Sequence, residues 1–279
     1  MKKLLLLFLA IGICLQYSCD LKKAKKDDTN MKTFHDDDYA AAWATIDSLR
    51  KKGLPQSALE KANELYRQAK QDNSSNQIIK TVMVRGNLIE EVDEDGQVKA
   101  INNLRREIES TAMPVQAILQ SMLGERYASY LRRYQWQLRN RTEINDYQPE
   151  DIKTWSIANF IDASAVYYLA SLDHDGMDTI NIEQFAPITT EPRNVEGLRP
   201  SLYDFLAHRA LGHFMNDRSY LTEPVYAFQL NMEDAFAKAE KFAALKMKVK
   251  DTESRKYQAF RIFQKLISAH LNDEDPKAL

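Results

Sequence analysis

The sequence predicts an all-α protein in which helical hairpins similar to tetratricopeptide repeats form an α-solenoid, with loop-rich connections. Glycine and proline are scarce, with 8 of each among 279 residues, and this favours long helices over a turn-rich β fold. Apolar residues recur at i, i+3, i+4 and i+7 along several segments, which is the period of an amphipathic helix. Two successive hairpins between residues 54 and 133 superpose after a shift of about forty residues, as in helical repeat arrays.

We expect the helical-hairpin array to cover residues 36–133. Its first helix should begin at Asp36–Asp38, because carboxylates favour a helix N-terminus. Gly53 should end this helix and Pro55 should open the next one, since glycine suits helix C-termini and proline suits the first helical position. Ser57–Glu60 has the spacing of a capping box, although Pro55 competes with it as the helix start.

The two hairpins share an apolar pattern and are divided by polar breaks. Residues 72–75 divide the first hairpin, residues 93–96 separate the hairpins, and Pro114 opens the last helix. The residues expected on the buried faces of the four helices are Ala58, Ala62, Tyr66 and Ala69; Ile78, Ile79, Val82 and Ile89; Ala100, Ile101, Leu104 and Ile108; and Ile118, Leu119, Met122 and Tyr130.

Residues 134–279 are expected to form a further helical region. The acidic cluster and proline at residues 272–276 are typical of a helix start, so we expect the natural protein to continue beyond Leu279. Before that point the sequence predicts an ordered connection at 134–146, helices at about 149–172, 201–215 and 254–271, a loop-rich stretch at 173–200 and an interruption at Pro224.

The first 18 residues have the features of a signal peptide. A charged start precedes the apolar run Leu4–Ile13, which is shorter than the ~20 residues that span a bilayer. A small residue, Ser18, then precedes Cys19, as at bacterial lipoprotein processing sites, although Gln16 and Tyr17 are not the usual aliphatic and small residues. We therefore expect lipidation of Cys19; the alternative is ordinary signal cleavage nearby.

This reading implies an exported protein, lipid-anchored to the bacterial cell envelope in the periplasm or at the outer-membrane surface. Residues 19–35, rich in Lys and Asp, would be a flexible tether. The other cysteine, Cys14, lies in the segment to be removed, so the exported body has no thiol for a disulfide, a metal site or a nucleophile.

The composition argues against several classes of partner. The net charge of −2 provides no basic field for nucleic acid, and the short basic runs at Lys22–Lys26 and Arg132-Arg133 are expected to be solvated. The sequence contains no nucleophile elbow, phosphate-binding loop or dinucleotide fingerprint. The adjacent carboxylates Glu90-Glu91 suit a solvated helix face. We therefore expect no enzyme activity, no cofactor and no small-molecule substrate.

Two further motifs were weighed as metal sites. His208 and His213 are five residues apart on one predicted helix, whereas zinc ligands on a helix are usually four apart, so a packing or surface role is expected. Asp173–Asp178 resembles the start of a calcium loop, but Met177 takes a ligand position and Gly176 comes two residues early, so a solvated acidic turn is expected. No metal is expected at either place.

Motifs along nearly the whole exported part, in this order and spacing, resemble the N-terminal helical region of the large alpha-2-macroglobulin-like proteins of Bacteroidetes-type bacteria. These motifs are Asp47–Leu49 with Lys52–Lys61, Asn140–Thr142, Asp151–Trp155 and Pro200–Leu211. The resemblance implies an exported, membrane-anchored protein whose relatives continue into macroglobulin β-sandwich domains and trap proteases.

The trapping machinery of that family is missing from this sequence. It contains no Cys-x-Glu-Gln thioester motif, no recognisable bait segment and no β-sandwich pattern. The first hypothesis is therefore an anchoring and protein-binding scaffold, the helical N-terminal region of such an endopeptidase inhibitor. The second is a self-contained tetratricopeptide-like lipoprotein that acts as an assembly scaffold or glycan-uptake component. In both cases the partners are proteins, and the membrane is contacted through the lipid.

Overall fold

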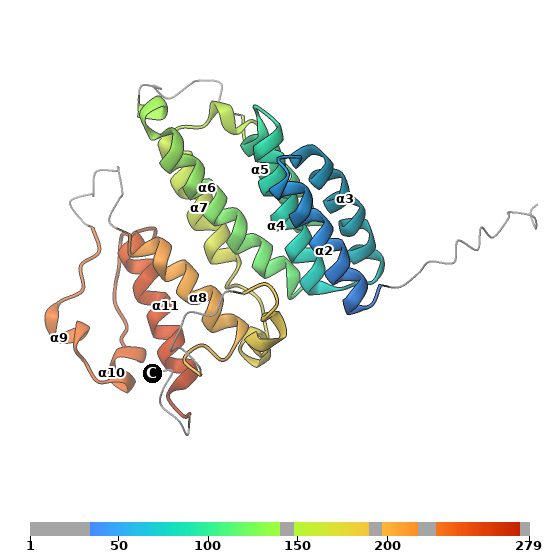
Figure 1. Ribbon diagram of the computed structural model, residues 1–279. Coiled ribbons are helices and arrows are strands. Elements are labelled where there is room, and N and C mark those ends of the chain that lie inside the picture. Colours follow the sequence, from blue (N-terminus) through green and yellow to red (C-terminus); the bar gives the residue numbers. More distant parts are fainter. Residues whose placement is uncertain (1–33, 140–147, 190–196, 217–226, 274–279) are drawn as a thin grey trace, which may run out of the picture. The chain divides into compact units, whose positions relative to one another are not determined.

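Helices form where the apolar period predicts them. The computed structural model describes residues 34–139, 148–189, 197–216 and 227–273, and among these residues the regular structure is helical (Figure 1). The β structure described there is a single isolated bridge between Asn181 and Ser201. The chain divides into two units, Met1–Phe34 and His35–Leu279, and every described helix belongs to the second. The predicted all-α class is confirmed.

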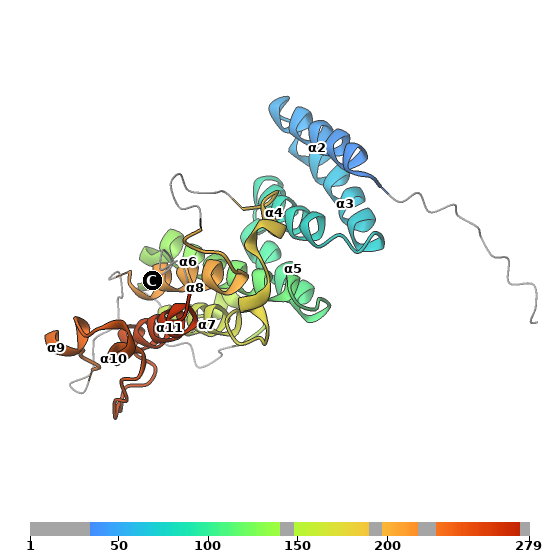
Figure 2. The same ribbon diagram turned by 90° about the horizontal axis from the view of Figure 1, so that it is seen from below.

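The array consists of helices that each pack antiparallel on the next one in the chain, which confirms the predicted hairpins. Figure 2 shows the pair α2 and α3 beside the pair α4 and α5. The helices are α2 (Asp36–Lys51), α3 (Pro55–Gln71), α4 (Ser75–Val92), α5 (Gly96–Glu109) and α6 (Val115–Arg139).

The predicted helix ends of the array are mostly confirmed. Gly53, with φ of 70°, follows α2, and Pro55 is the first residue of α3 with Leu54 as its N-cap. The predicted capping box at Ser57–Glu60 is wrong, because the proline already starts the helix two residues earlier. Helix α6 continues through Arg139, so residues 134–139 are helical and not part of a connection as expected. The rest of the predicted connection, with Asn140–Thr142, lies outside the described residues.

The apolar pattern correctly identified the core of the array. Twelve of the sixteen predicted positions are buried, and Tyr66, Ile89, Met122 and Tyr130 are half-buried. Leu65 and Leu88, next to two of these, are buried instead, which rotates the buried face by one residue at those points.

Polar contacts also join neighbouring helices of the array. Glu107 of α5 is buried, and it accepts hydrogen bonds from the Tyr66 hydroxyl at 2.5 Å and from Lys70 Nζ at 2.8 Å. Glu90 of α4 pairs with Arg126 of α6, so it does not lie on a merely solvated face as the sequence suggested. These contacts link α3 to α5 and α4 to α6, so they connect helices that are separated by one helix in the chain and add to the packing of each helix on the next.

The rest of the chain mixes helices with short turns. The predicted helix at 149–172 is divided, because Trp155 is extended and Ser156 caps a new helix. The helices are η2 (Ile152–Thr154), α7 (Ile157–Ala170), η3 (Met177–Thr179), η4 (Ile182–Phe185), α8 (Leu202–Phe214), α9 (Met232–Ala235), α10 (Ala239–Ala243) and α11 (Arg255–His270).

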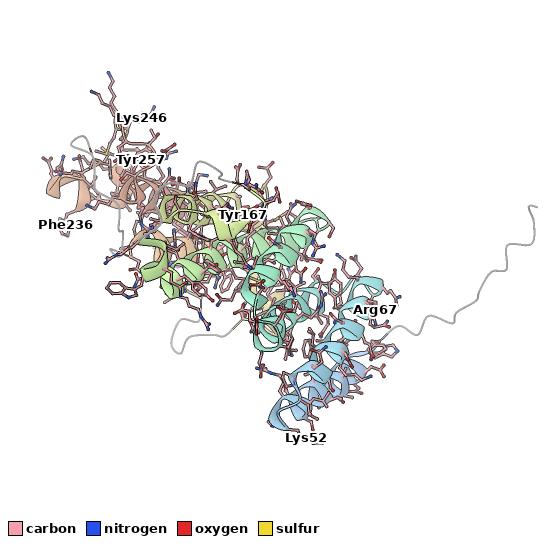
Figure 3. All side chains as sticks on the ribbon, turned by 90° about the horizontal axis from the view of Figure 1, so that it is seen from above. Lys52, Arg67, Tyr167, Phe236, Lys246 and Tyr257 are labelled. Atoms are coloured by element: carbon pink, nitrogen blue, oxygen red, sulfur yellow. The ribbon has the colours of Figure 1, made fainter. Side chains whose placement is uncertain are left out.

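These later helices pack across long sequence separations. Helix α8 contacts α6, α7 and α11, and α11 also contacts α10. A cluster of Phe228, Phe242 and Phe260 joins the segment before α9 to α10 and α11. Phe236 directly follows α9, and its side chain is 78% exposed; Figure 3 labels it at the left edge of the view.

Several predictions fall outside the described residues. These are the signal peptide at 1–18, Cys19 with most of the tether at 19–35, Pro224 and the end of the chain at 274–279. Along the part of the chain that the structure describes, no helix is both long enough and apolar enough to cross a membrane.

Candidate functional site, an arginine-lined cleft

A cavity of about 270 Å³ lies where α6, α7, α8 and the first residue of α11 meet. We call it the arginine cleft, because three of its lining residues are arginines. Its walls are made by Glu125, Ala128, Leu131, Arg132, Phe160, Ile161, Ser164, Tyr168, His208, Arg209, Gly212, His213, Asn216 and Arg255.

The close crossing of α6 and α7 sets the positions of two walls of the cleft. Helices α6 and α7 approach at Gly124, whose main-chain carbonyl accepts a hydrogen bond from Ser164 Oγ at 2.7 Å. A Cβ atom at Gly124 would lie 2.8 Å from Cδ2 of Tyr168, so glycine allows this approach. Capping boxes at Ser156 and Ser201 fix where α7 and α8 begin.

Glu125 is the acidic residue of the cleft, and its hydrogen bonds are internal. It accepts from the Tyr168 hydroxyl at 2.7 Å, from Ser129 Oγ at 3.0 Å and from Arg132 Nη2 at 2.7 Å. Burial opposes the charged form, but these donors outweigh it and hold the pKa of the Glu125 carboxyl below its usual range. Glu125 is therefore an ionised, fully engaged acceptor.

His213 is the buried base of the cleft. Its ring stacks on Tyr168 with 4.6 Å between the ring centroids, and its Nε2 atom is buried without a hydrogen-bond partner among the described residues. Burial, followed by the nearby charge of Arg255, lowers the pKa of His213 to about 4. The ring is therefore neutral near pH 7.

The three arginines surround this pair of rings. Arg132 and Arg255 both act electrostatically on His213, and Arg132 and Arg209 both act on Tyr168. Arg255 Nη2 donates to the main-chain carbonyl of His213 at the end of α8. The cleft therefore carries three guanidinium groups against one carboxylate, Glu125.

Two larger hollows beside α11 have a different character. Their volumes are about 660 and 390 Å³, and both include Asp173, Tyr203, Arg261 and Lys265. The larger one is lined by Asp173, Asp175 and Asp178 together with the two basic residues of α11, and the smaller one by Asp173 with the same two basic residues. The arginine cleft is smaller, and three arginines and one carboxylate are among its lining residues.

Two residues of this cleft were considered in the sequence analysis as possible metal ligands. His208 and His213, weighed as zinc ligands, both line it, and His213 packs on Tyr168 in accordance with the expected packing role. Among the described residues no group of three or more His, Cys, Asp or Glu side chains could hold a metal ion. Arg132, expected to be solvated, keeps 44% of its side chain exposed but binds Glu125.

The remaining predicted positions lie elsewhere. Asp173, Asp175 and Asp178 are exposed, as expected for a solvated acidic turn, and Met177 is buried as an anchor of that turn. Arg209, Arg255 and Tyr168 were not predicted, because the contacts that assemble them span 40 to 88 residues, as between Arg209 and Ser121. Helical spacing gives no signal for such contacts.

Comparisons with protein-family models, with curated proteins and with solved structures gave no match.

Proposed function

We propose that this chain is a protein-binding scaffold of the bacterial cell envelope, corresponding to the helical N-terminal region of an alpha-2-macroglobulin-like lipoprotein. In this role it positions the inhibitor near the membrane and holds a partner protein. The observation that carries the proposal is the arginine cleft, a recess lined by three arginines beside a helical-hairpin scaffold. Helical arrays of this kind commonly present binding surfaces.

The anchor is the second part of the proposal. Lipidation of Cys19 would attach the helical body to the membrane through the tether at 19–35. A single lipidated N-terminus gives stable anchoring when it carries more than one acyl chain. Mass spectrometry of the exported N-terminus tests this part directly. An unmodified N-terminus at any residue other than Cys19 would rule out the lipid anchor.

Site-specific photocrosslinking tests partner binding. p-Benzoylphenylalanine is placed at Met215, which is 60% exposed and precedes the cleft residue Asn216, in cells that make the natural full-length protein. The matched control carries it at Leu54, which is 48% exposed and lies between α2 and α3. We expect one discrete protein adduct from Met215 and none from Leu54.

The identity of the adduct separates the two hypotheses. An adduct with a β-sandwich region of the same polypeptide or with a protease supports the macroglobulin-like scaffold. An adduct with an envelope assembly or glycan-uptake component supports the self-contained lipoprotein. The absence of an adduct at Met215, or equal labelling at Leu54, would contradict a binding role for the cleft.

A further inference from the structure

We propose that the segment of residues 246–250 binds an acidic peptide, which adds to it as a β-strand. The segment lies between α10 and α11, where Figure 1 draws it as an irregular stretch of chain, and none of its residues lines the arginine cleft. The inference rests on the proposed function only in that the partner is a protein. It requires neither the cleft nor the lipid anchor.

Exposure alternates strictly along this segment, which contains neither a helix nor a hydrogen-bonded turn. Met247 and Val249 are half-buried and pack against the phenylalanine cluster of α10 and α11. Lys246, Lys248 and Lys250 are exposed, and Figure 3 shows Lys246 extending away from the ribbon. Successive side chains of a β-strand point to opposite faces, so the segment has the arrangement of a strand with its lysines on the outer face.

The main chain of the segment has free donors and acceptors. None of its N–H or C=O groups forms a hydrogen bond with a described residue. The segment is nevertheless fixed at both ends, because Gln264 Nε2 donates to the Leu245 carbonyl at 2.8 Å and Asp251 accepts from the Phe228 N–H at 3.3 Å. An edge of this kind is the template to which an extended peptide adds as a further strand. Because the segment is already fixed, it loses little conformational entropy on binding.

The three lysines determine which peptide fits. None of them forms a salt bridge along the described chain, whereas their neighbour Lys241 pairs with Glu233 at 3.7 Å. Alternate residues of a strand are about 6.5–7 Å apart, so carboxylates at every second position of an added strand would each lie opposite one lysine. A second copy of the segment would instead place like charges opposite each other, which is unfavourable. The partner is therefore an acidic strand.

The test titrates the full chain with three capped heptapeptides in a calorimeter at low salt. In the first peptide three glutamates alternate with threonines. The second has the same composition with its glutamates in one block, and the third has glutamines in place of the glutamates. We expect the alternating acidic peptide to bind at least about tenfold more tightly than either control, since only it can place a carboxylate opposite each lysine. Added salt should weaken this binding, because the lysines are exposed.

Amide hydrogen exchange, followed residue by residue by NMR, shows whether the main chain pairs. Successive N–H groups of a strand point to opposite edges, so a peptide added along one edge protects alternate amides. We expect protection either at residues 246, 248 and 250 or at residues 247 and 249. Contact between charges alone would leave all five amides unprotected.

Substitutions locate the site. The test variant removes the three charges of the segment and carries Lys246→Gln, Lys248→Gln and Lys250→Gln. The matched control removes three exposed charges from the end of α2 and carries Arg50→Gln, Lys51→Gln and Lys52→Gln. We expect the first variant to bind the alternating peptide about tenfold or more weakly and the control to change binding less than about twofold. Circular dichroism checks that both variants are folded.

Several results would overturn the proposal. These are equal binding of the alternating and block peptides, binding without amide protection, equal effects of the two variants, and no binding of any peptide. Binding to phosphatidylglycerol vesicles but not to the alternating peptide would assign the lysines to a membrane surface and also overturn it. Peptide binding without a photocrosslink at Met215 would refute the role proposed for the cleft and leave the strand site standing. The reverse result would refute the strand site alone.

Discussion

The hairpin array of α2–α6 and the region from α7 to α11 are held together in different ways. In the array each helix packs on the next one in the chain, and a polar pair such as Tyr66 and Glu107 links α3 to α5, the next helix but one. In the later region α8 packs on α6 and α11, and His270 reaches Asp204 across 66 residues at 2.8 Å. The arginine cleft forms where this long-range packing begins, so the proposed binding site depends on that packing.

This difference predicts how far damage spreads. Local arrays lose stability near the altered repeat, whereas a region assembled by long-range contacts unfolds as a unit. The following substitutions test that contrast, in descending order of expected effect.

Phe160→Ala should have the largest effect. Phe160 is fully buried and packs against Tyr127, Tyr130 and Trp155, so truncation should cost about 3–5 kcal/mol. Leu65→Ala in α3 is the counterpart in the array. Hydrogen exchange should show loss of protection throughout α6–α8 for the first and mainly in α2–α4 for the second. The same spread for both variants would contradict the contrast.

Glu107→Gln tests the buried polar network of the array. The side chain is 10% exposed and accepts from Tyr66 and Lys70, so neutralising it should cost about 1–3 kcal/mol in chemical denaturation. Glu64→Gln is the control, because that side chain is 54% exposed in its pair with Lys61 and should change stability by less than about 0.5 kcal/mol. Equal losses of unfolding free energy in the two variants would show that the buried network stabilises the array no more than an exposed ion pair does.

Gly124→Ala tests the close crossing of α6 and α7. The new Cβ would lie 3.1 Å from the Ser164 carbonyl oxygen and closer still to Tyr168, so overpacking should outweigh the gain in helix propensity by about 1 kcal/mol. Gly212→Ala in α8 meets nothing within 4 Å and should raise stability by up to about 1 kcal/mol. Thermal unfolding should therefore show a lower midpoint temperature for Gly124→Ala and a higher one for Gly212→Ala.

Three histidines of the later region have shifted pKa values and should give stability a maximum near pH 6.5. Burial lowers the pKa of His208, as it does that of His213, whereas the pKa of His270 is raised. The folded pKa of His213 is lowered to about 4, so its contribution is lost as pH falls from about 6.5 toward 4. Burial alone would lower the pKa of His270, but the hydrogen bonds that its ring donates to the carboxylates of Asp204 and Asp273 raise it, so its contribution is lost as pH rises through that higher value.

Single substitutions separate these two effects. His213→Gln should flatten the acidic limb by about 1 kcal/mol over the window in which its ring titrates, and His270→Gln should flatten the alkaline limb. Denaturant unfolding between pH 4 and 8 gives the curves. If His213→Gln left the acidic limb unchanged, the neutral buried ring would not be the cause of that limb.

Helix positions could be predicted from the sequence more accurately in the array than in the later region. The apolar period placed α2–α5 within a few residues, because each helix finds its partner in the adjacent segment and Gly53 and Pro55 mark the ends. The same period joined η2 and α7 into one helix, because Trp155 fits the apolar face although its backbone is extended.

The sequence by itself determined the helical class, the hairpins and most of the array's buried residues, since these depend on periodicity and helix-end chemistry within a few turns. Only the tertiary structure decided that Arg132, Arg209 and Arg255 meet around Tyr168 and His213. No local rule couples positions 121 and 209 or 204 and 270, because their contacts form only when distant helices pack. The cleft is a product of that packing.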